Sequence, residues 1–330
     1  MVKFCSVFKE EFWNFLAVRE TVLSKSAFNH DQCYIASLDA YLSDCNLMEK
    51  VIFEPIVIGW SKTLTGKASS KANKIIVIRI FIKYLHSLGI SAFMPVIPRV
   101  ADDYIPYIFS DEELKKIFDE ADNISMTKSQ PNPFMQAEFP MVLRLLYGCG
   151  LRIGETLALQ MKDADLDGGV LTLLHTKNCK QRIVPMSPSL MEILKRYCLA
   201  MGLIGKFDAY LFPSADPTRP MSIRSAHNKF DLILKNTGIA LKSRNWHERG
   251  PCMHFFRHLF VFKSFSKAEY EGRSIDNSVP FLSIYLGHDS LNETDKYLKF
   301  SSELYPHALD LFEDYAGEVF PEVDYEEEIH

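Results

Sequence analysis

The sequence predicts a mainly α-helical protein of two domains with one small β-hairpin or sheet. Its 330 residues exceed what a single hydrophobic core usually organises, which favours two domains. The first 90 residues contain segments with apolar side chains at three-to-four-residue spacing, which is typical of helices that share a core. A later segment of β-forming residues is followed by a polar turn and a second such segment, which indicates a hairpin.

The N-terminal domain is predicted over residues 1–90 as a compact helical unit. Its helices are expected at 4–24, 30–48, 50–64 and 69–88. Lys67, Lys71 and Lys74 lie around the start of the last helix and make one end of this domain basic, which indicates either a solvated face or a surface for an anionic partner. A linker is predicted over 91–109, where Pro95, Pro98 and Pro106 interrupt helical structure.

The second domain is predicted over 110–300 and begins with a capping box, Ser110 followed by Glu113. Further on, the glycines of Gly148-Cys149-Gly150 suit the end of a helix, and the next helix is expected to carry Arg152 and Glu155. Strands are expected at 170–175 and 182–185, with the polar tetrad Lys177-Asn178-Cys179-Lys180 between them. The pattern is mainly helical from Pro188 onward.

The charge of the chain is unevenly distributed. Residues 301–330 carry ten carboxylates and no lysine or arginine, so the other 300 residues have a net charge of +5 although the whole chain has −5. A basic body with an acidic tail is compatible with DNA binding. An apolar stripe at helical spacing, formed by Leu304, Ala308, Leu311, Phe312 and Tyr315, predicts a C-terminal helix that is buried on its own domain or on a neighbouring copy.

The seven cysteines are scattered and form no CxxC pair, so we interpret them as reduced thiols that act as small buried apolar side chains. No second cysteine or histidine stands at ligand spacing, and we predict no metal and no cofactor. No apolar run reaches the length of a membrane span, and the N-terminus opens no signal peptide. These observations predict a cytoplasmic protein without a membrane partner.

His254 and Arg257 stand three residues apart in an apolar helical stretch, so both polar groups are expected to emerge on one helix face. Such a pair arises by chance too often to carry a function alone. It belongs, however, to an ordered series that runs through the second domain: Arg152 within Gly-Leu-Arg-Ile-Gly-Glu, Lys177 in the hairpin, the His254/Arg257 pair, His288 within Leu-Gly-His, and Tyr297 nine residues later.

In this series the sequence resembles the tyrosine recombinase (phage integrase) family over roughly residues 107–300. The resemblance implies a C-shaped clamp made of a helical core-binding domain, 1–90, and a catalytic domain, 110–300. It implies six catalytic residues: Arg152, Lys177, His254, Arg257, His288 and Tyr297. No metal or nucleotide is needed by such enzymes, whose active assembly is a homo-tetramer on double-stranded DNA with specific recombination sites, although the free protein can be monomeric.

The implied chemistry agrees with what these side chains can do. Two arginines remain charged at every relevant pH and can bind the phosphate oxygens on which charge accumulates during strand cleavage. A phenol is protonated at neutral pH and needs an acceptor, for which His254 is the candidate. Lys177 is expected to protonate the departing 5′ oxygen, and His288 to donate to a phosphate oxygen. Glu155 is expected to orient a neighbour.

Two assignments have rivals within the sequence. Lys177 is flanked by Thr176 and Asn178 where the family often has glycine, so Lys180 is its rival. Tyr297 is favoured as nucleophile because Asp289-Ser290 can cap a short helix in which Thr294 and Tyr297 share a face. Tyr285 lies in an apolar run and is interpreted as core.

The sequence therefore predicts a site-specific recombinase, an integrase or transposase of a mobile element, that acts through a 3′-phosphotyrosyl intermediate in the nucleoid. A type IB topoisomerase and a catalytically inert DNA-binding accessory protein or repressor are the alternatives. Accessory DNA-bending proteins are further expected partners. Besides the lysines of the first domain, we expect DNA contacts from Lys180, Arg182, Arg224 and Arg244, while Arg219 and Lys242 are other candidates for reading bases.

Overall fold

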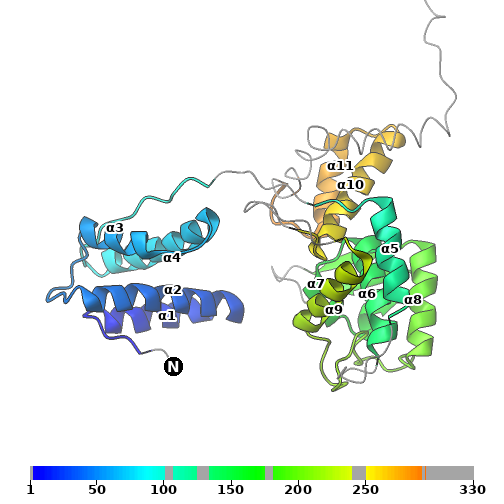
Figure 1. The fold of residues 1–330 in the computed structure, drawn as a ribbon, viewed down its shortest axis with the longest axis horizontal. Helices are drawn as coiled ribbons and strands as arrows, with labels where there is room; N and C mark the ends of the chain where they lie inside the picture. The colour runs from blue at the N-terminus through cyan, green and yellow to red at the C-terminus, as the bar shows by residue number, and fades with distance from the viewer. Residues whose placement is uncertain are drawn as a thin grey trace, which may run out of the picture. The chain divides into compact units, whose positions relative to one another are not determined.

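The computed structural model describes residues 3–100, 107–124, 134–174, 181–239, 250–291 and 294. The chain divides into two compact units, Met1–Asp103 and Tyr104–His330 (Figure 1). Helices dominate the described part of both units, and the second unit adds a small antiparallel sheet, which confirms the mainly α prediction. None of the described helices is long and apolar enough to cross a membrane.

The helices of the first unit confirm the four predicted from the spacing of apolar residues. They are α1 (Lys9–Val22), α2 (Lys25–Asp44), α3 (Glu54–Thr63) and α4 (Ala68–Ser87). Their shared core is rich in aromatic side chains: Phe12 of α1 stacks on Phe81 of α4 with ring centroids 4.6 Å apart, and Trp60 of α3 is fully buried. Ser24 caps α2 by accepting a hydrogen bond from the Ala27 amide.

The start of α4 concentrates positive charge. Lys67 is its N-cap residue and is exposed, Lys71 and Lys74 are half-buried, and the first turn contains no acidic residue. Lysines at a helix N-terminus are unfavourable for the helix itself, because they face the positive end of its dipole. This end of the unit is therefore suited to an anionic partner.

The second unit is organised around α6 (Met135–Cys149), which is buried along most of its length. The other helices are α5 (Asp111–Asp122), α7 (Ile153–Ala158), α8 (Pro188–Ala200), α9 (Ile223–Thr237), α10 (His254–Tyr270) and α11 (Ile275–Leu286). The predicted capping box at α5 is confirmed, because the Ser110 hydroxyl accepts from the Glu113 amide and the Glu113 carboxylate accepts from the Ser110 amide.

The predicted hairpin is also confirmed. After the short 3-10 helix η1 (Met161–Asp163), strand β2 (Val170–Leu173) pairs antiparallel with β3 (Arg182–Pro185), so that Leu173 lies opposite Arg182. A two-residue strand, β1 (Ala164–Asp165), extends the sheet on the other side of β2 and was not predicted. The tip of the hairpin, 175–180, lies outside the described residues.

The cysteines differ from expectation in one respect. Cys149 and Cys198 are buried, as expected of small apolar side chains, but Cys5, Cys33 and Cys45 are exposed. All the described cysteines are free thiols. The exposed ones lie on or beside α1 and α2, whose buried faces are filled by larger side chains.

Candidate active site

The turn between α6 and α7 presents the first arginine of the series. Gly150 ends α6 in the left-handed conformation, with φ of 59°, and a Cβ atom at this position would lie 2.5 Å from the ring of Phe260. Only glycine meets both conditions without strain. Arg152 was expected within the next helix, but it is the N-cap residue of α7, and 23% of its side chain is exposed.

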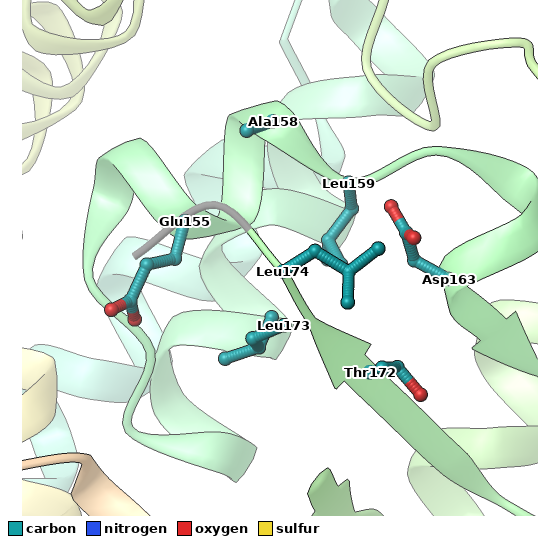
Figure 2. A pocket seen from close by; sticks show the side chains of 7 residues that line it. All are labelled: Glu155, Ala158, Leu159, Asp163, Thr172, Leu173 and Leu174. Atoms are coloured by element: carbon teal, nitrogen blue, oxygen red, sulfur yellow. The ribbon is translucent and has the colours of Figure 1, made fainter. Parts of the chain in front are cut away.

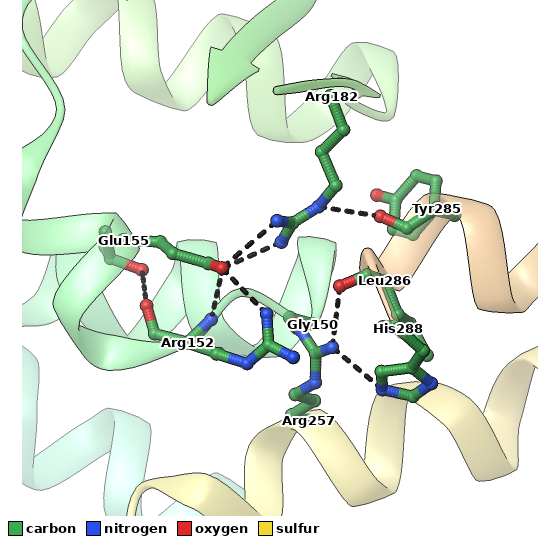
Figure 3. Close-up of polar contacts among 9 residues, drawn as sticks. Gly150, Arg152, Glu155, Arg182, Arg257, Tyr285, Leu286 and His288 are labelled. Carbon is green, nitrogen blue, oxygen red and sulfur yellow. Dashed lines mark hydrogen bonds and ion pairs between the residues drawn. The ribbon is translucent and has the colours of Figure 1, made fainter. Parts of the chain in front are cut away.

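Glu155 holds Arg152 in place from the first turn of α7. Its carboxylate accepts a hydrogen bond from the Arg152 backbone amide (3.0 Å) and another from Arg152 Nη1 (2.9 Å). The same carboxylate accepts two hydrogen bonds from Arg182 of β3, at 3.0 and 2.7 Å (Figure 3). One buried acid therefore joins two arginines that come from different elements.

The ionisation of Glu155 follows from these contacts. Burial alone would raise its pKa, but hydrogen bonds and attraction from Arg182, together with the contacts from Arg152, outweigh burial and lower the pKa to about 2. The carboxyl is therefore charged throughout the neutral range. This state supports the expectation that Glu155 orients a neighbour and does not transfer protons.

Arg257 is held inside the unit. Only 1% of the residue is exposed, and its guanidinium donates to the carbonyl oxygens of Gly150 (2.8 Å) and Leu286 (2.8 Å). The expectation that Arg257 and His254 emerge together was wrong: His254, the first residue of α10, is exposed, whereas Arg257 turns inward toward these two carbonyls. The rigid anchoring leaves little freedom for this guanidinium to reorient.

His288 contacts Arg257 directly. Arg257 Nη2 lies 3.0 Å from His288 Nε2, and His288 Nδ1 lies 2.7 Å from the hydroxyl of the buried Thr294. Because a guanidinium has no acceptor, Nε2 accepts this hydrogen bond, and Nδ1 carries the proton and donates to Thr294. Burial and then the charge of Arg257 lower the pKa of His288 to about 3, so the ring is neutral.

His254 is paired with a second histidine one turn along α10. The His254 and His258 rings meet edge to face with centroids 5.0 Å apart. Burial, followed by the charges of His254 and Arg257, lowers the pKa of His258 to about 3. The half-buried His258 ring is thus neutral and packs against the exposed His254.

The structure thus brings Arg152, Glu155, Arg257 and His288 into one region (Figure 3). His254 begins α10, the helix that carries Arg257. Arg224 is exposed near the start of α9. Lys177, Lys180, Arg244 and Tyr297 lie outside the described residues. Tyr285, interpreted as core, is half-buried against the second unit's core, its hydroxyl donates to the Pro185 carbonyl, and burial raises its pKa.

A small pocket adjoins this region between α7, η1 and β2, and Glu155 is among its lining residues (Figure 2). It has room for about one water molecule. Within the described ranges, no three His, Cys, Asp or Glu side chains are grouped so that they could hold a metal ion.

Two contributions to the site were not predicted from the sequence. Arg182 was expected to contact DNA, but it is 9% exposed and bound to Glu155. Thr294 was placed on the face of Tyr297, and its contact with His288 was not foreseen. The signal for Arg182 was a basic residue beside the apolar pair Ile183-Val184, whereas Thr294 stands among polar residues and its sequence carried no signal.

Known proteins resemble this chain over most of its length. The model of the Phage integrase family matches residues 108–303. A putative integrase/recombinase, y4rB, of Sinorhizobium fredii is 26% identical over 273 residues, which cover 77% of this chain and 82% of that protein. Tyrosine recombinase XerC of Bacillus pumilus is 30% identical over 253 residues, which cover 74% of each.

Solved structures share the fold. The XerH site-specific recombinase bound to its palindromic difH substrate superposes with a TM-score of 0.64 at 20% identity, covering 87% of this chain and 80% of that one. A dimer of lambda integrase residues 75–356 bound to a COC′ core site gives a TM-score of 0.64 at 14% identity, with coverages of 87% and 94%. The chain belongs to the phage integrase family, and it is a tyrosine-type site-specific recombinase.

Proposed function

We propose that this recombinase cuts one DNA strand by attack of the Tyr297 hydroxyl on the scissile phosphate. The O–P bond to Tyr297 forms, the P–O5′ bond breaks, and the free 5′ hydroxyl of a partner strand later reverses the step. A phosphotyrosyl ester conserves the energy of the phosphodiester, so no nucleotide is consumed. The observation that carries the proposal is the anchoring of Arg152 by Glu155 and of Arg257 by two carbonyls.

Each remaining side chain has a defined role in this proposal. Arg152 and Arg257 bind the nonbridging oxygens, where preorganised donors stabilise developing charge most effectively. His254, exposed at the start of α10, accepts the proton of the attacking phenol, and Lys177 supplies a proton to O5′. His288 accepts from Arg257 through Nε2 and thereby helps to hold that guanidinium. Its expected donation to a phosphate oxygen requires the ring to leave this contact, because a guanidinium cannot accept from a protonated Nε2.

Duplex DNA is the proposed substrate. The lysines at the start of α4 and the exposed Arg224 support it, since phosphate contacts by basic side chains supply most non-specific affinity. XerH and lambda integrase were both solved on their DNA sites. We further propose a tetramer on paired sites, a role in the mobility of an integrating element, and a location with the chromosome in the cytoplasm.

A suicide substrate tests this function. A nicked half-site built from the genomic flanks of the gene should trap the protein as a covalent adduct that survives denaturing electrophoresis. Strand exchange between two labelled sites then separates a recombinase from a type IB topoisomerase, which would relax supercoiled DNA without joining partners. Binding without any adduct would identify an inert accessory protein and overturn the proposal.

Metal removal should not affect cleavage. The proposed charge stabilisation comes from guanidinium groups, so an excess of EDTA should leave the rate of adduct formation unchanged within about twofold. A chelator-treated sample supplemented with Mg²⁺ is the control, because it separates effects of ionic strength from effects of the metal. Loss of cleavage in EDTA and recovery with Mg²⁺ would indicate a metal-dependent mechanism.

Protonation of the leaving group distinguishes the two hairpin lysines. Lys177→Ala should slow cleavage of an ordinary strand by about 10²-fold, within the range of general-acid contributions. A substrate with sulfur at the 5′-bridging position should restore the rate, because a thiolate leaves without a proton. Lys180→Ala is the matched control and should cleave both substrates normally. The reverse pattern would transfer the role to Lys180.

A further inference from the structure

Arg182 opens β3, directly after the hairpin tip, and its guanidinium is enclosed. Nη1 and Nη2 donate to the two carboxylate oxygens of Glu155, at 3.0 and 2.7 Å, and Nε donates to the Tyr285 carbonyl at 2.9 Å. Only 7% of its side chain is exposed. The expected DNA contact is disfavoured, because a bidentate pair with the Glu155 carboxylate occupies the edge of the guanidinium that a phosphate would bind.

This buried ion pair is not explained by stability alone. Removing a guanidinium and a carboxylate from water costs free energy that their attraction often does no more than offset, and an apolar pair of similar volume commonly stabilises a fold as well. A bidentate arginine–carboxylate pair differs from an apolar pair in fixing both partners in one geometry. The role of the pair therefore depends on the residues that contact Glu155 and on those that follow Tyr285 in the chain.

Glu155 links Arg182 to Arg152, the first arginine of the site, because its Oε1 accepts hydrogen bonds from both side chains. In Figure 3 the carboxylate lies between the two guanidinium groups. Without Arg182, one of the two groups that hold this carboxylate in place is lost. The orientation of Arg152 would then depend on an acid with freedom to turn.

The Tyr285 carbonyl links Arg182 to the part of the site that contains Arg257 and His288. Its carbonyl precedes that of Leu286, which accepts from Arg257, and Gly287 and His288 follow. Gly287 packs against Arg182 so closely that a Cβ there would lie 3.0 Å from Arg182 Nη1. Arg182 therefore contacts both the end of α11, which carries His288, and the carboxylate that holds Arg152.

We propose that Arg182 is a positioning residue for strand cleavage, which fixes Arg152 through Glu155 and sets the end of α11 against it. The inference rests on the proposed function, since it assigns Arg152 to the phosphate. Arg182 does not touch DNA and transfers no proton. Its effect is to keep two distant segments of the chain at the spacing that the phosphate requires.

Arg182→Met tests the proposal in single-turnover cleavage of the suicide substrate. A displacement of about 1 Å in a transition-state ligand can cost about 10²-fold, which is the loss expected here. Arg182→Lys keeps the positive charge on a single donor nitrogen and should recover part of the cleavage rate. Arg196→Met is the matched control, because Arg196 is exposed on α8 and pairs with Glu192 one turn earlier on its own helix. It should cleave like the wild type.

The pH profile reports a change that a purely structural role would not produce. Glu155 is faced by Arg152 and Arg182, with His288 and, across the small pocket, Asp163 nearby. Removing Arg182 takes away the strongest of the contacts that lower the pKa of Glu155, so burial is then opposed by the Arg152 contacts and the pKa rises. Arg182→Met should therefore lose cleavage additionally as pH falls from 7 to 5. The wild type should lack this added loss, since its Glu155 stays ionised.

Two further measurements test whether Arg182 acts through Glu155. In Arg182→Met/Glu155→Gln the added loss of cleavage between pH 7 and 5 should disappear, because no carboxyl remains to be protonated. The cleavage rate should match that of the slower single variant, because both substitutions disturb the same support of Arg152. The 5′-thiolate substrate should not restore Arg182→Met, since the leaving-group proton is not what this variant lacks. Restoration by the thiolate, or losses that multiply in the double variant, would overturn the assignment through Glu155.

The outcomes separate this inference from the function on which it depends. If the wild type forms no adduct, the proposed function fails. If the wild type cleaves and a folded Arg182→Met cleaves within about threefold of it, the positioning role fails alone. Thermal unfolding and single-site DNA binding of each variant, measured beside cleavage, show whether a loss of rate reflects loss of fold.

Discussion

Tyr297→Phe is expected to abolish the covalent protein–DNA adduct and to leave single-site DNA binding nearly unchanged. The substitution removes one oxygen, the atom that forms the bond to phosphorus, and keeps the aromatic ring. Incubation with a nicked half-site followed by denaturing electrophoresis measures the adduct, and a mobility shift on the intact site measures binding. The adduct should fall below detection, because no other group supplies the nucleophile.

Other tyrosines provide the controls for this experiment. Tyr285→Phe removes a hydroxyl that donates to the Pro185 carbonyl and whose pKa is raised by burial, so it should retain cleavage. Tyr305→Phe should also cleave normally. An undiminished adduct in Tyr297→Phe together with its loss in either control would move the nucleophile to that position.

Arg257→Ala should reduce the cleavage rate by at least about 10²- to 10³-fold, the scale observed when one preorganised transition-state donor is removed. It should also lower the free energy of unfolding, because the carbonyls of Gly150 and Leu286 lose their donor inside the protein. Each such orphaned group costs about 1–3 kcal/mol. Rates must therefore be measured well below the unfolding temperature of the variant.

Arg152→Ala separates the chemical effect from the structural one. Its side chain is 23% exposed and donates to the neighbouring acid Glu155, so its removal should cost less stability while cleavage falls by a similar factor. Single-turnover rates and thermal unfolding of both variants make the comparison. A wild-type rate in either variant would remove that arginine from the phosphate site.

The fold was largely predictable because its elements are specified locally. Ile75, Ile78 and Ile82 lie on the buried face of α4, as their spacing indicates. The capping box of α5 lies within four residues of sequence. Gly150 was correctly placed at a helix end, since a left-handed residue after an apolar helix is a local signal.

The interior of the site was less predictable, because its partners are distant in sequence. In β3, Arg182 and Val184 share one face and Ile183 the other, and the pattern alone does not say which is buried. The arginine face is buried because Arg182 forms an ion pair with Glu155, 27 residues earlier in the chain. Arg257 was misplaced for the same reason: arginine is rarely buried, and its acceptor at Gly150 is 107 residues away.

This dependence on distant acceptors has a consequence for protein synthesis. Arg182 and Arg257 leave the ribosome before Tyr285 and Leu286, whose carbonyls receive them at the end of α11. Domains form from the N-terminus during synthesis, so Glu155 and the Gly150 carbonyl are available first, and both guanidinium groups wait for their remaining acceptors until α11 is complete. A chain that ends before α11 lacks the Tyr285 and Leu286 carbonyls as well as Tyr297, so an unfinished chain is expected not to cleave DNA.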